Sequence, residues 1–519
     1  MNANDLKNDY KYEKTKKRDF SLIRRLYDIR EKEEYTLDDQ SYDDLNMDSV
    51  YKKIDRTYSS VGESALYCML RDLKMNSNEL IKRSKLIELF RDNIDLRAKV
   101  HVHYFNLGFD NKNSLLDMIE NYLIINKKKF YIYTFLGKIL PLILFILAIV
   151  MLNPNFILGL FALICFNCGY ISYIESREIK DYGLVYLRRV IVAAKNISKI
   201  DLYELNEYTE RIKVILNELK VIDKGTIVIG FSKALLGAFE AIAIPLLLEE
   251  SAYYGISGEI EEKKDLIFEL YYILGEIEVL ISVACYQGSL DGNFSKPEFI
   301  KEVQLEIEEG IHPLVEDAIP NSININNKGI VLTGTNMSGK STFLRMLGIN
   351  IVFAQSFNFV LAKKYKSCFF NIVSSISPND DVNEGKSYYM AEAESILRII
   401  KATEKEVPVF CPIDEIFRGT NPTERIAASA EILKYINSKK TISIVATHDR
   451  ELSEILKENY EFFYFSERVD SKEGLSFDYK LKTGVSKTKN AIKLLEYMGY
   501  PKAIVNNAYE RSESLEKFI

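Results

Sequence analysis

The sequence contains few cysteines, and their positions follow no disulfide pattern. Six occur among 519 residues, at Cys68, Cys165, Cys168, Cys285, Cys368 and Cys411. Scattered cysteines of this kind are typical of proteins in a reducing cytoplasm, so we expect no disulfide framework. Residues 1–50 also lack the apolar stretch of a secretory signal peptide. Their dense mixed charge predicts a mobile or helical N-terminal extension instead.

An excess of positive charge is also absent. The formal net charge is −6, so the chain as a whole has no general electrostatic attraction to DNA. This balance still leaves room for a local basic face. The pair His101 and His103 has no cysteine or third histidine nearby, which argues against a metal site there.

A glycine-rich loop follows the short apolar run GIVLT. Residues Gly334 to Thr342 read GTNMSGKST and match the phosphate-binding pattern G-x-x-x-x-G-K-[ST] between a predicted strand and a predicted helix. The pattern predicts that Lys340 reaches the β- and γ-phosphates of a nucleotide and that the Ser341 hydroxyl ligates Mg²⁺. The other predicted nucleotide-binding positions of the loop are Gly334, Thr335, Asn336, Met337, Ser338, Gly339 and Thr342. The alternative is a glycine-rich turn that matches by chance.

Two later strands are predicted to end in polar residues. VPVFCPIDEIFRGT, from Val407 to Thr420, delivers adjacent carboxylates. Asp414 is suited to hold Mg²⁺, and Glu415 to orient or deprotonate the attacking water. A solvated acidic turn is the alternative. The run TISIVAT precedes His448, which can sense the γ-phosphate or position water, although a structural histidine would also fit.

The three motifs GTNMSGKST, DEIFRGT and ATHD together resemble the ATPase domain of the MutS family, which belongs with the ABC-type ATPases. The resemblance implies a catalytic trio of Lys340, Glu415 and His448, the cofactors ATP and Mg²⁺, and hydrolysis of ATP to ADP and phosphate. NEGKSYYMAEAESIL is similar to the family's signature segment, which a partner chain donates across a dimer. Gly385 and Ser387 would then contact the γ-phosphate in trans, and a homodimer is expected.

The resemblance also implies two residues at the adenine site, and the sequence differs from the family pattern in two places. Asn321 is expected near the adenine and Tyr479 beside the adenine base. Phe417 stands where the family usually has a glycine. The first 129 residues contain no Phe-x-Glu, the motif with which mismatch-detecting relatives wedge the duplex, so we do not expect that mode of mismatch reading.

A long apolar segment interrupts the N-terminal half. From Phe130 to Ile174 the only charged residue is Lys138, and the turn Asn153-Pro154-Asn155 divides the segment into two arms. The second arm is long enough to span a bilayer, and the first spans if Lys138 snorkels toward an interface. Positive residues flank both outer ends, which predicts that both ends are cytoplasmic. A buried helical hairpin in a soluble core is the alternative.

These observations predict a mixed fold. An all-α core and lever domain with an inserted transmembrane hairpin would precede an α/β P-loop ATPase domain and a helical tail. The predicted boundaries are 1–50 for the charged extension, 51–129 and 176–300 for the helical core and lever, 130–175 for the hairpin, 301–486 for the ATPase domain and 487–519 for a helical dimerisation segment. The predicted ATPase strands lie near 329–333, 370–374, 407–413 and 441–446.

Two functions remain open at this point. The first is a dimeric ATPase of the repair type that binds mismatched or branched DNA, tethered to the cell membrane with its ATPase domain in the cytoplasm. The second is a membrane-anchored mechanochemical ATPase that uses the same engine on an unknown protein partner rather than DNA.

Overall fold

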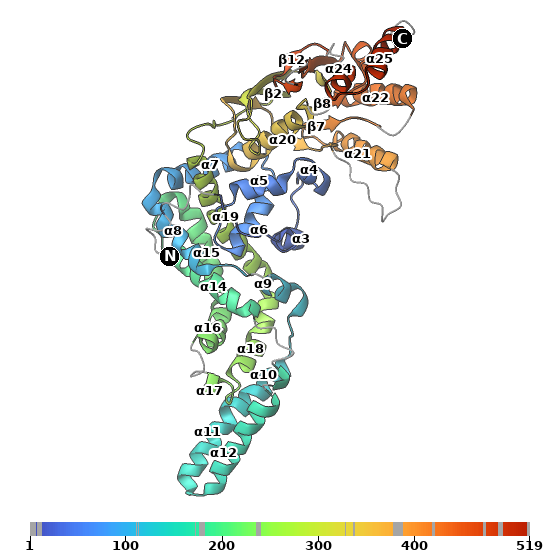
Figure 1. The fold of residues 1–519 in the computed structure, drawn as a ribbon. Coiled ribbons are helices and arrows are strands. Elements are labelled where there is room, and N and C mark those ends of the chain that lie inside the picture. The colour runs from blue at the N-terminus through green and yellow to red at the C-terminus, as the bar shows by residue number, and fades with distance from the viewer. Residues whose placement is uncertain are drawn as a thin grey trace. The chain divides into compact units, whose positions relative to one another are not determined.

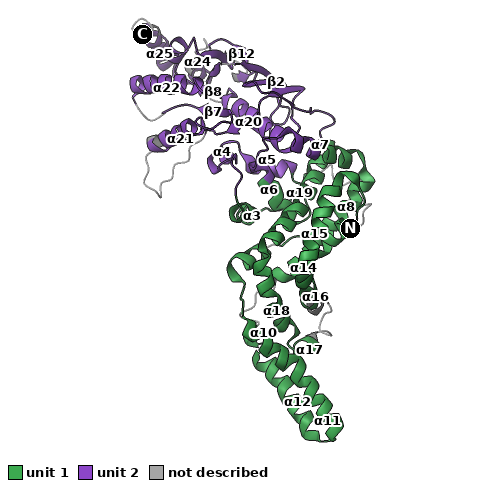
Figure 2. Ribbon diagram, turned by 180° about the vertical axis from the view of Figure 1, so that it is seen from behind, with its two compact units in different colours: residues 1–31, 55–68, 85–289 green, residues 32–54, 69–84, 290–519 purple. Residues whose placement is uncertain are grey.

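The chain contains helices throughout, and strands are concentrated in its C-terminal half (Figure 1). The computed structural model describes residues 7, 13–110, 112, 114–171, 173–175, 182–234, 240–326, 328–335, 338–376, 388–417, 421–470, 474–485 and 491–515. Two compact units are present (Figure 2), the first made of residues 1–31, 55–68 and 85–289 and the second of residues 32–54, 69–84 and 290–519.

The first unit is helical in its described residues. Two helices, α6 (Ser60–Arg71) and α7 (Ser77–Asp92), contribute residues to both units. The α-helices that lie wholly in the first unit, outside the apolar segment, are α2 (Phe20–Ile23), α3 (Arg25–Ile29), α8 (Ile94–Leu107), α9 (Ser114–Asp117), α14 (Tyr182–Ile197), α15 (Asn206–Glu218), α16 (Lys220–Ala234), α17 (Glu240–Ala243), α18 (Leu248–Glu262) and α19 (Lys264–Gly288). In α19, apolar residues recur every three or four positions, and Leu270, Ile277 and Leu280 are fully buried. This spacing predicts the helix from sequence, and burial of the apolar face stabilises it.

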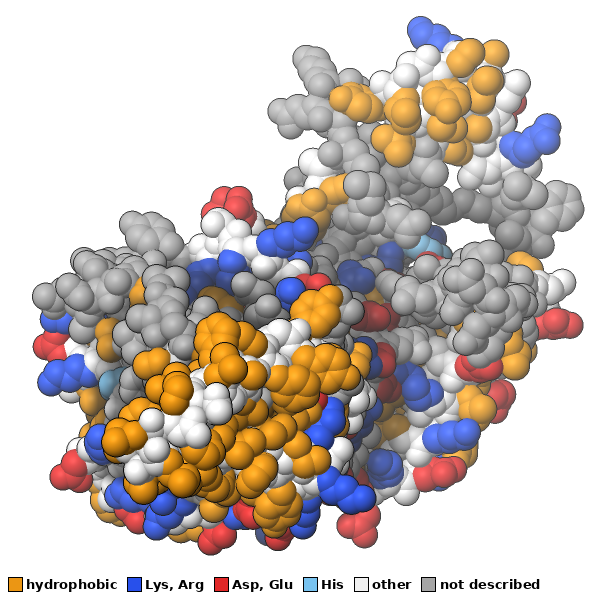
Figure 3. Space-filling model, turned by 90° about the horizontal axis from the view of Figure 1, so that it is seen from below, with side chains coloured by type: hydrophobic (Ala, Val, Ile, Leu, Met, Phe, Trp, Pro, Cys, Tyr) orange, Lys and Arg blue, Asp and Glu red, His pale blue; other side chains and the backbone are white. Residues whose placement is uncertain are grey.

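The apolar segment forms a helical hairpin. Its first arm comprises α10 (Lys127–Thr134), the π-helical turn η3 (Phe135–Ile139) and α11 (Leu140–Met151), and its second comprises α12 (Pro154–Phe166) and the π-helical turn η4 (Asn167–Ile171). By length and composition, Lys127–Met151 and Pro154–Glu175 are each able to cross a membrane, and only 11% and 18% of their most apolar windows are buried. A core helix of a soluble protein is mostly buried, so low burial argues against that alternative. Figure 3 shows a large patch of hydrophobic side chains with charged side chains around its edge.

The second unit is built on a six-stranded sheet with the order β12-β9-β4-β8-β7-β6. These strands are β4 (Gly329–Thr333), β6 (Asn371–Ile372), β7 (Val409–Asp414), β8 (Thr441–Thr447), β9 (Tyr460–Tyr464) and β12 (Lys482–Thr483). All pairs are parallel except β9 with β12. The α/β architecture expected for this region is therefore confirmed, and β4 begins and ends where the sequence predicts.

Helices cover the sheet. They are α20 (Lys340–Phe357), α21 (Tyr388–Ala402), α22 (Pro422–Asn437) and α23 (Glu451–Ile455), and two more, α24 (Ala491–Tyr497) and α25 (Lys502–Leu515), follow near the C-terminal end. Every residue of β4, β7 and β8 is buried, as expected for parallel strands with both faces covered. Val331, Cys411 and Val445 share one hydrophobic core with α21 and α22. This rigid layer fixes the strand ends from which the candidate site is built.

Several elements of the second unit were not predicted. A four-stranded sheet contains β1 (Glu298–Phe299), β5 (Lys364–Ser367), β2 (Gln304–Gly310) and β3 (Asn321–Asn326) in that order. By contrast, β10 (Glu467–Asp470) pairs with β11 (Gly474–Phe477) where the sequence resembles the closing β-hairpin of the family. The N-terminal helices α4 (Asp39–Asp44) and α5 (Met47–Ile54) also belong to this unit, whereas the sequence had placed residues 1–50 in one extension. The Asp44 carboxylate accepts hydrogen bonds from Ser374 Oγ at 2.6 Å and Ile376 N at 3.0 Å. Such long-range contacts leave no local pattern in the sequence.

Candidate functional site

The glycine-rich loop connects β4 to α20 through backbone conformations that require glycine. Gly334 has φ +144° and Gly339 has φ +106°, values at which any side chain would be strained. A Cβ atom on Gly334 would lie 2.9 Å from the backbone oxygen of Phe465. The loop therefore packs against the backbone of Phe465 at a distance that leaves no space for a side chain at position 334. This shape leaves its N–H groups free of side-chain bulk at the start of a helix, where anions bind.

Lys340 is the first residue of α20 and is almost fully buried. Its Nζ donates hydrogen bonds to the carbonyl oxygens of Gly334 at 2.7 Å and Thr335 at 2.9 Å. The ammonium group is thereby held against the loop that would carry the phosphates. Of the other predicted loop positions, Ser338 is buried, and Asn336 and Met337 lie outside the described residues.

Ser341 and Asp414 meet at the end of β7. The Ser341 hydroxyl donates a hydrogen bond to Asp414 Oδ2, although 73 positions separate them in the chain. An alcohol oxygen and a carboxylate oxygen are hard donors of the kind that Mg²⁺ prefers. The donor set predicted from the sequence is therefore assembled in space and fits the ion.

Glu415 and His448 come from neighbouring parallel strands. Asp414, the last residue of β7, pairs with Ala446 of β8, and the Glu415 N–H donates to the Ala446 carbonyl at 2.8 Å. Glu415 Oε1 lies 2.9 Å from His448 Nε2. Because the carboxyl ends of parallel strands meet at one edge of the sheet, the residues that directly follow β7 and β8 come close together there.

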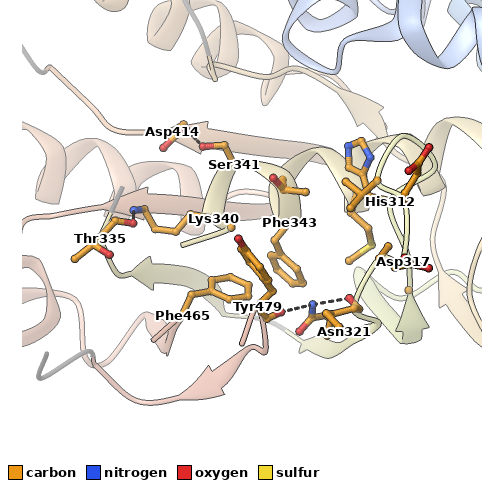
Figure 4. Close-up of a pocket in the computed structure, with 18 of the residues that line it drawn as sticks. His312, Asp317, Asn321, Thr335, Lys340, Ser341, Phe343, Asp414, Phe465 and Tyr479 are labelled. Atoms are coloured by element: carbon orange, nitrogen blue, oxygen red, sulfur yellow. Dashed lines mark hydrogen bonds between the residues drawn. The ribbon is translucent and has the colours of Figure 1, made fainter. Parts of the chain in front are cut away.

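A cavity of about 850 Å³ opens beside the loop (Figure 4). Its lining combines Thr335, Gly339, Lys340, Ser341, Thr342, Asp414 and Glu415 with the apolar side chains of Val315, Ile319, Phe343, Met346, Phe465 and Tyr479. The rings of Phe343 and Phe465 meet edge to face, with centroids 5.7 Å apart. Glu316 and Asp317 also line the cavity. The polar residues of the loop and the apolar residues around Phe343 together suit a ligand with a phosphate end and a flat apolar end.

Asn321 and Tyr479 lie together on the apolar side. Asn321 Nδ2 donates to the Tyr479 carbonyl at 3.0 Å, and Asn321 Oδ1 accepts from the Leu481 N–H at 2.8 Å. These bonds hold the turn around Tyr479, whose φ is +50°. A Cβ atom on Gly339 would lie 3.3 Å from the Tyr479 ring, so the ring is next to the phosphate-binding loop. The structure therefore places Asn321 as a support for Tyr479 within the lining of the cavity.

His312 also lines the cavity. Burial, together with the positive charge of Arg345, lowers the pKa of His312 to about 4, so its imidazole is neutral at physiological pH. Its Nδ1 accepts a hydrogen bond from the Leu314 N–H at 3.2 Å. This hydrogen bond fixes the backbone of the segment from His312 to Leu314 beside the cavity, so the role of His312 is structural.

The structure therefore brings together most of the predicted site. Lys340, Ser341, Asp414, Glu415 and His448 converge at adjacent strand ends, and Gly385 and Ser387 lie outside the described residues. Phe343, Met346 and Phe465 were missed. Phe343 and Met346 are spaced three positions apart on the helix that follows the loop, which is a helical-face signal, but many core residues share that spacing.

Comparison with known proteins places this site in a family. Residues 330–516 match the family model described as MutS domain V. The DNA mismatch repair protein MutS of Clostridium perfringens is 29% identical over 374 residues, which cover 67% of this chain and 39% of that relative. That of Thermotoga petrophila is 29% identical over 350 residues, covering 65% and 43%. That of Clostridium botulinum strain Hall is 30% identical over 298 residues, covering 54% and 31%. The chain thus spans about two fifths of the length of the first two relatives.

Proposed function

The chain belongs to the MutS family, and we propose that it is an ATPase that couples ATP hydrolysis to binding of mismatched or branched DNA while tethered to a membrane. One observation carries the ATPase part of the proposal. Lys340 and Ser341 follow β4, Asp414 ends β7 and Glu415 comes directly after it, and His448 follows β8. These three strands are neighbours in one sheet.

In the proposed reaction, the loop N–H groups and Lys340 bind the β- and γ-phosphates, and the apolar side of the cavity accepts the base. Glu415 accepts a proton from the attacking water, or orients it toward the γ-phosphorus, and His448 holds the Glu415 carboxylate in place. The water oxygen forms the new P–O bond as the bond to the β-phosphate oxygen breaks, giving ADP and phosphate. Fixed donors in a partly buried site stabilise the charge that develops.

Ser341 and Asp414 would hold a magnesium ion, because their oxygen atoms already meet in the structure. When bound, the ion would neutralise charge on the phosphate oxygens. On the family resemblance, we further propose a homodimer in which Gly385 and Ser387 of one chain complete the nucleotide site of the other.

The membrane part of the proposal rests on the hairpin of residues 130–175. Both arms are long and apolar enough to cross a bilayer, and they are mostly exposed. Lys127 and Lys128 are exposed at one outer end, where they would meet anionic headgroups on the cytoplasmic side. The ATPase unit would then work at the cytoplasmic surface of the cell membrane.

The experiment is DNA binding by the detergent-solubilised full chain, with ATP and without nucleotide, at two salt concentrations. Homoduplex, mismatched and branched probes are compared for the wild type and for a Glu415→Gln variant that would retain ATP. ATP-dependent binding that prefers the mismatched or branched probe supports the proposal. Equal binding to all probes with no response to ATP overturns its DNA part.

The exposed hairpin favours a second candidate, an ATPase whose partner is a membrane protein. Absence of binding to any probe, combined with ATP hydrolysis that changes when detergent is replaced by lipid vesicles, would select this candidate. Salt dependence separates the two further, because DNA binding weakens steeply as salt rises.

A further inference from the structure

A second apolar segment lies in the first unit, outside the hairpin. Residues 226–248 contain only two charged residues, Lys233 and Glu240. In its described part after α16, the segment contains α17 and a non-helical turn at residues 244–247, which leads into α18. Ile242 is 56% exposed and Ile244 is 36% exposed. Large aliphatic side chains with this exposure are costly in water and are favourable in lipid.

The turn at 244–247 contacts the hairpin directly. A Cβ atom on Gly137 would lie 2.1 Å from the Leu246 carbonyl oxygen, so only glycine lets the turn approach this closely. Asn167 is fully buried, and its Nδ2 donates to the carbonyl oxygens of Pro245 at 2.8 Å and Leu136 at 3.1 Å. One buried amide therefore satisfies a carbonyl of the turn and a carbonyl of the first arm.

This contact has the form required of irregular backbone inside a bilayer. Backbone carbonyls have no water partner in hydrocarbon, so a non-helical turn is tolerated there only where protein groups satisfy it. The π-helical turns η3 and η4 occur at the same place, at Phe135–Ile139 and Asn167–Ile171. The Pro245 carbonyl therefore has the protein partner that a bilayer would require.

The exposed aromatic residues indicate the depth of the contact. Tyr131 and Tyr173 are exposed on the two arms, about equally far from the turn at Asn153, and tyrosines of this kind gather at the headgroup level. From Tyr131 to Asn153 the first arm extends about 33 Å, close to the thickness of the hydrocarbon core. Gly137 lies six positions beyond Tyr131, about 9 Å deeper along the helix. At that depth the contact is inside the near leaflet.

We infer that residues 240–248 form a second lipid-contacting element, which enters the near leaflet beside the hairpin with the Pro245 carbonyl of its turn satisfied by Asn167. Continuity with the hairpin and the exposed lysines at its base identify the occupant of this surface as an anionic bilayer. The inference rests on the proposed membrane tether and adds to it a second point of insertion. The first unit would then be anchored by two segments far apart in the sequence.

The test exploits the absence of tryptophan from the sequence. Three single-tryptophan variants of the full chain are prepared: Ile242→Trp in the second element, Leu158→Trp near the hairpin turn and Tyr203→Trp in the exposed 3-10 turn η5 (Tyr203–Leu205). Each is reconstituted in anionic vesicles whose acyl chains carry bromine either near the headgroup or deep in the bilayer. Bromine quenches tryptophan fluorescence only at short range, so quenching reports depth.

We expect Ile242→Trp to lose most of its fluorescence with bromine near the headgroup, and Tyr203→Trp to lose none with either lipid. Quenching of Leu158→Trp without quenching of Ile242→Trp would overturn the second element and leave the tether intact. Quenching of neither would overturn the tether itself. An Ile244→Trp variant provides a second reading of the same element if Ile242→Trp does not fold, as judged by helical circular dichroism.

Discussion

His448 Nε2 lies 2.9 Å from Glu415 Oε1, and this contact joins the ends of two neighbouring parallel strands. Each residue directly follows its strand, and the Glu415 N–H also donates to the Ala446 carbonyl of β8. The contact orients the carboxylate that the proposed mechanism uses to position water. It therefore contributes directly to the geometry of the proposed catalytic site.

Replacing His448 with alanine should lower kcat while leaving KM for ATP nearly unchanged. The carboxylate would lose its orienting partner, and misplacement of a catalytic group costs about 100-fold. His448→Gln, which keeps an N–H donor, should recover part of the loss. Steady-state ATP hydrolysis measures both, with His103→Ala in the first unit as the matched control. An unchanged kcat in His448→Ala would contradict this role.

Phe417 has φ +60° and is 6% exposed, so a bulky core residue occupies a backbone conformation that favours glycine. The strain is about 1–2 kcal/mol for a residue with a Cβ atom. Both Phe417→Ala and Phe417→Gly lose core packing, which costs about 3–5 kcal/mol, but only glycine releases the strain. We expect the glycine variant to be the more stable of the two by about 1 kcal/mol.

Urea unfolding of both Phe417 variants measures this order. Elsewhere in a folded chain, alanine is usually the better-tolerated substitution, since glycine loses more backbone entropy. A glycine variant less stable than the alanine variant would show that the left-handed conformation at position 417 is not strained.

Glu278 should make the stability of the first unit depend on pH. It is fully buried in α19, where it accepts hydrogen bonds from the Tyr58 N–H at 2.6 Å and from Ser59 Oγ. Burial raises the pKa of Glu278 to about 8. The folded state therefore keeps a proton that the unfolded state releases near pH 4.5. The free energy of unfolding should fall as pH rises from 4.5 to 8, by up to about 1.4 kcal/mol per pH unit.

A Glu278→Gln variant removes this titration and keeps the shape of the side chain. Its unfolding free energy should therefore change less between pH 6 and pH 8 than that of the wild type. Urea unfolding followed by helical circular dichroism at both pH values makes the comparison, with Glu276→Gln in the same helix as the control. Equal pH dependence in the wild type and in Glu278→Gln would contradict a raised pKa.

Asp44 should support the catalytic strand from the N-terminal part of the second unit. Its carboxylate accepts from Ser374 Oγ and the Ile376 N–H, and the intervening Ser375 accepts from the Asp414 N–H at 2.8 Å. Asp44→Ala would leave buried donors unsatisfied and destabilise the unit by about 2–4 kcal/mol. In Asp44→Ala, the Tm and the kcat for ATP hydrolysis should both fall. In the control Asp43→Ala, which changes an exposed neighbour, both should stay unchanged. Equal Tm and kcat values for Asp44→Ala and Asp43→Ala would show that the Asp44 carboxylate does not support the catalytic strand.

Local patterns predicted the ATPase strands well. The apolar runs that became β4 and β8 are flanked by turn residues and buried on both faces, so composition alone indicates their type. The four-stranded sheet and the packing of α4 were not predictable in this way. Edge strands such as β3 alternate polar and apolar residues over a short length, and Asp44 meets Ser374 across 330 positions. Contacts of that separation leave no periodic signal.

The polar half of the site was predictable because its chemistry needs a fixed order of residues. Gly334, Gly339, Lys340 and Ser341 belong to one short motif. Asp414 ends a recognisable strand, and Glu415 follows it. The apolar half was not predictable, because Phe343 and Phe465 meet only in the folded chain. The Asn321 contact with Tyr479 is of the same kind, since it joins two segments 158 positions apart.

The most direct test of the proposed ATPase site is to compare the rate of ATP hydrolysis by the detergent-solubilised full chain with that of its Glu415→Gln variant. We expect the wild type to release phosphate and Glu415→Gln to be slower by about 100-fold or more, with ATP binding retained. The control, Glu454→Gln, changes an exposed glutamate of α23 and should hydrolyse ATP at the wild-type rate. Equal hydrolysis by the wild type and Glu415→Gln would contradict the assignment of this site as the centre of an ATPase.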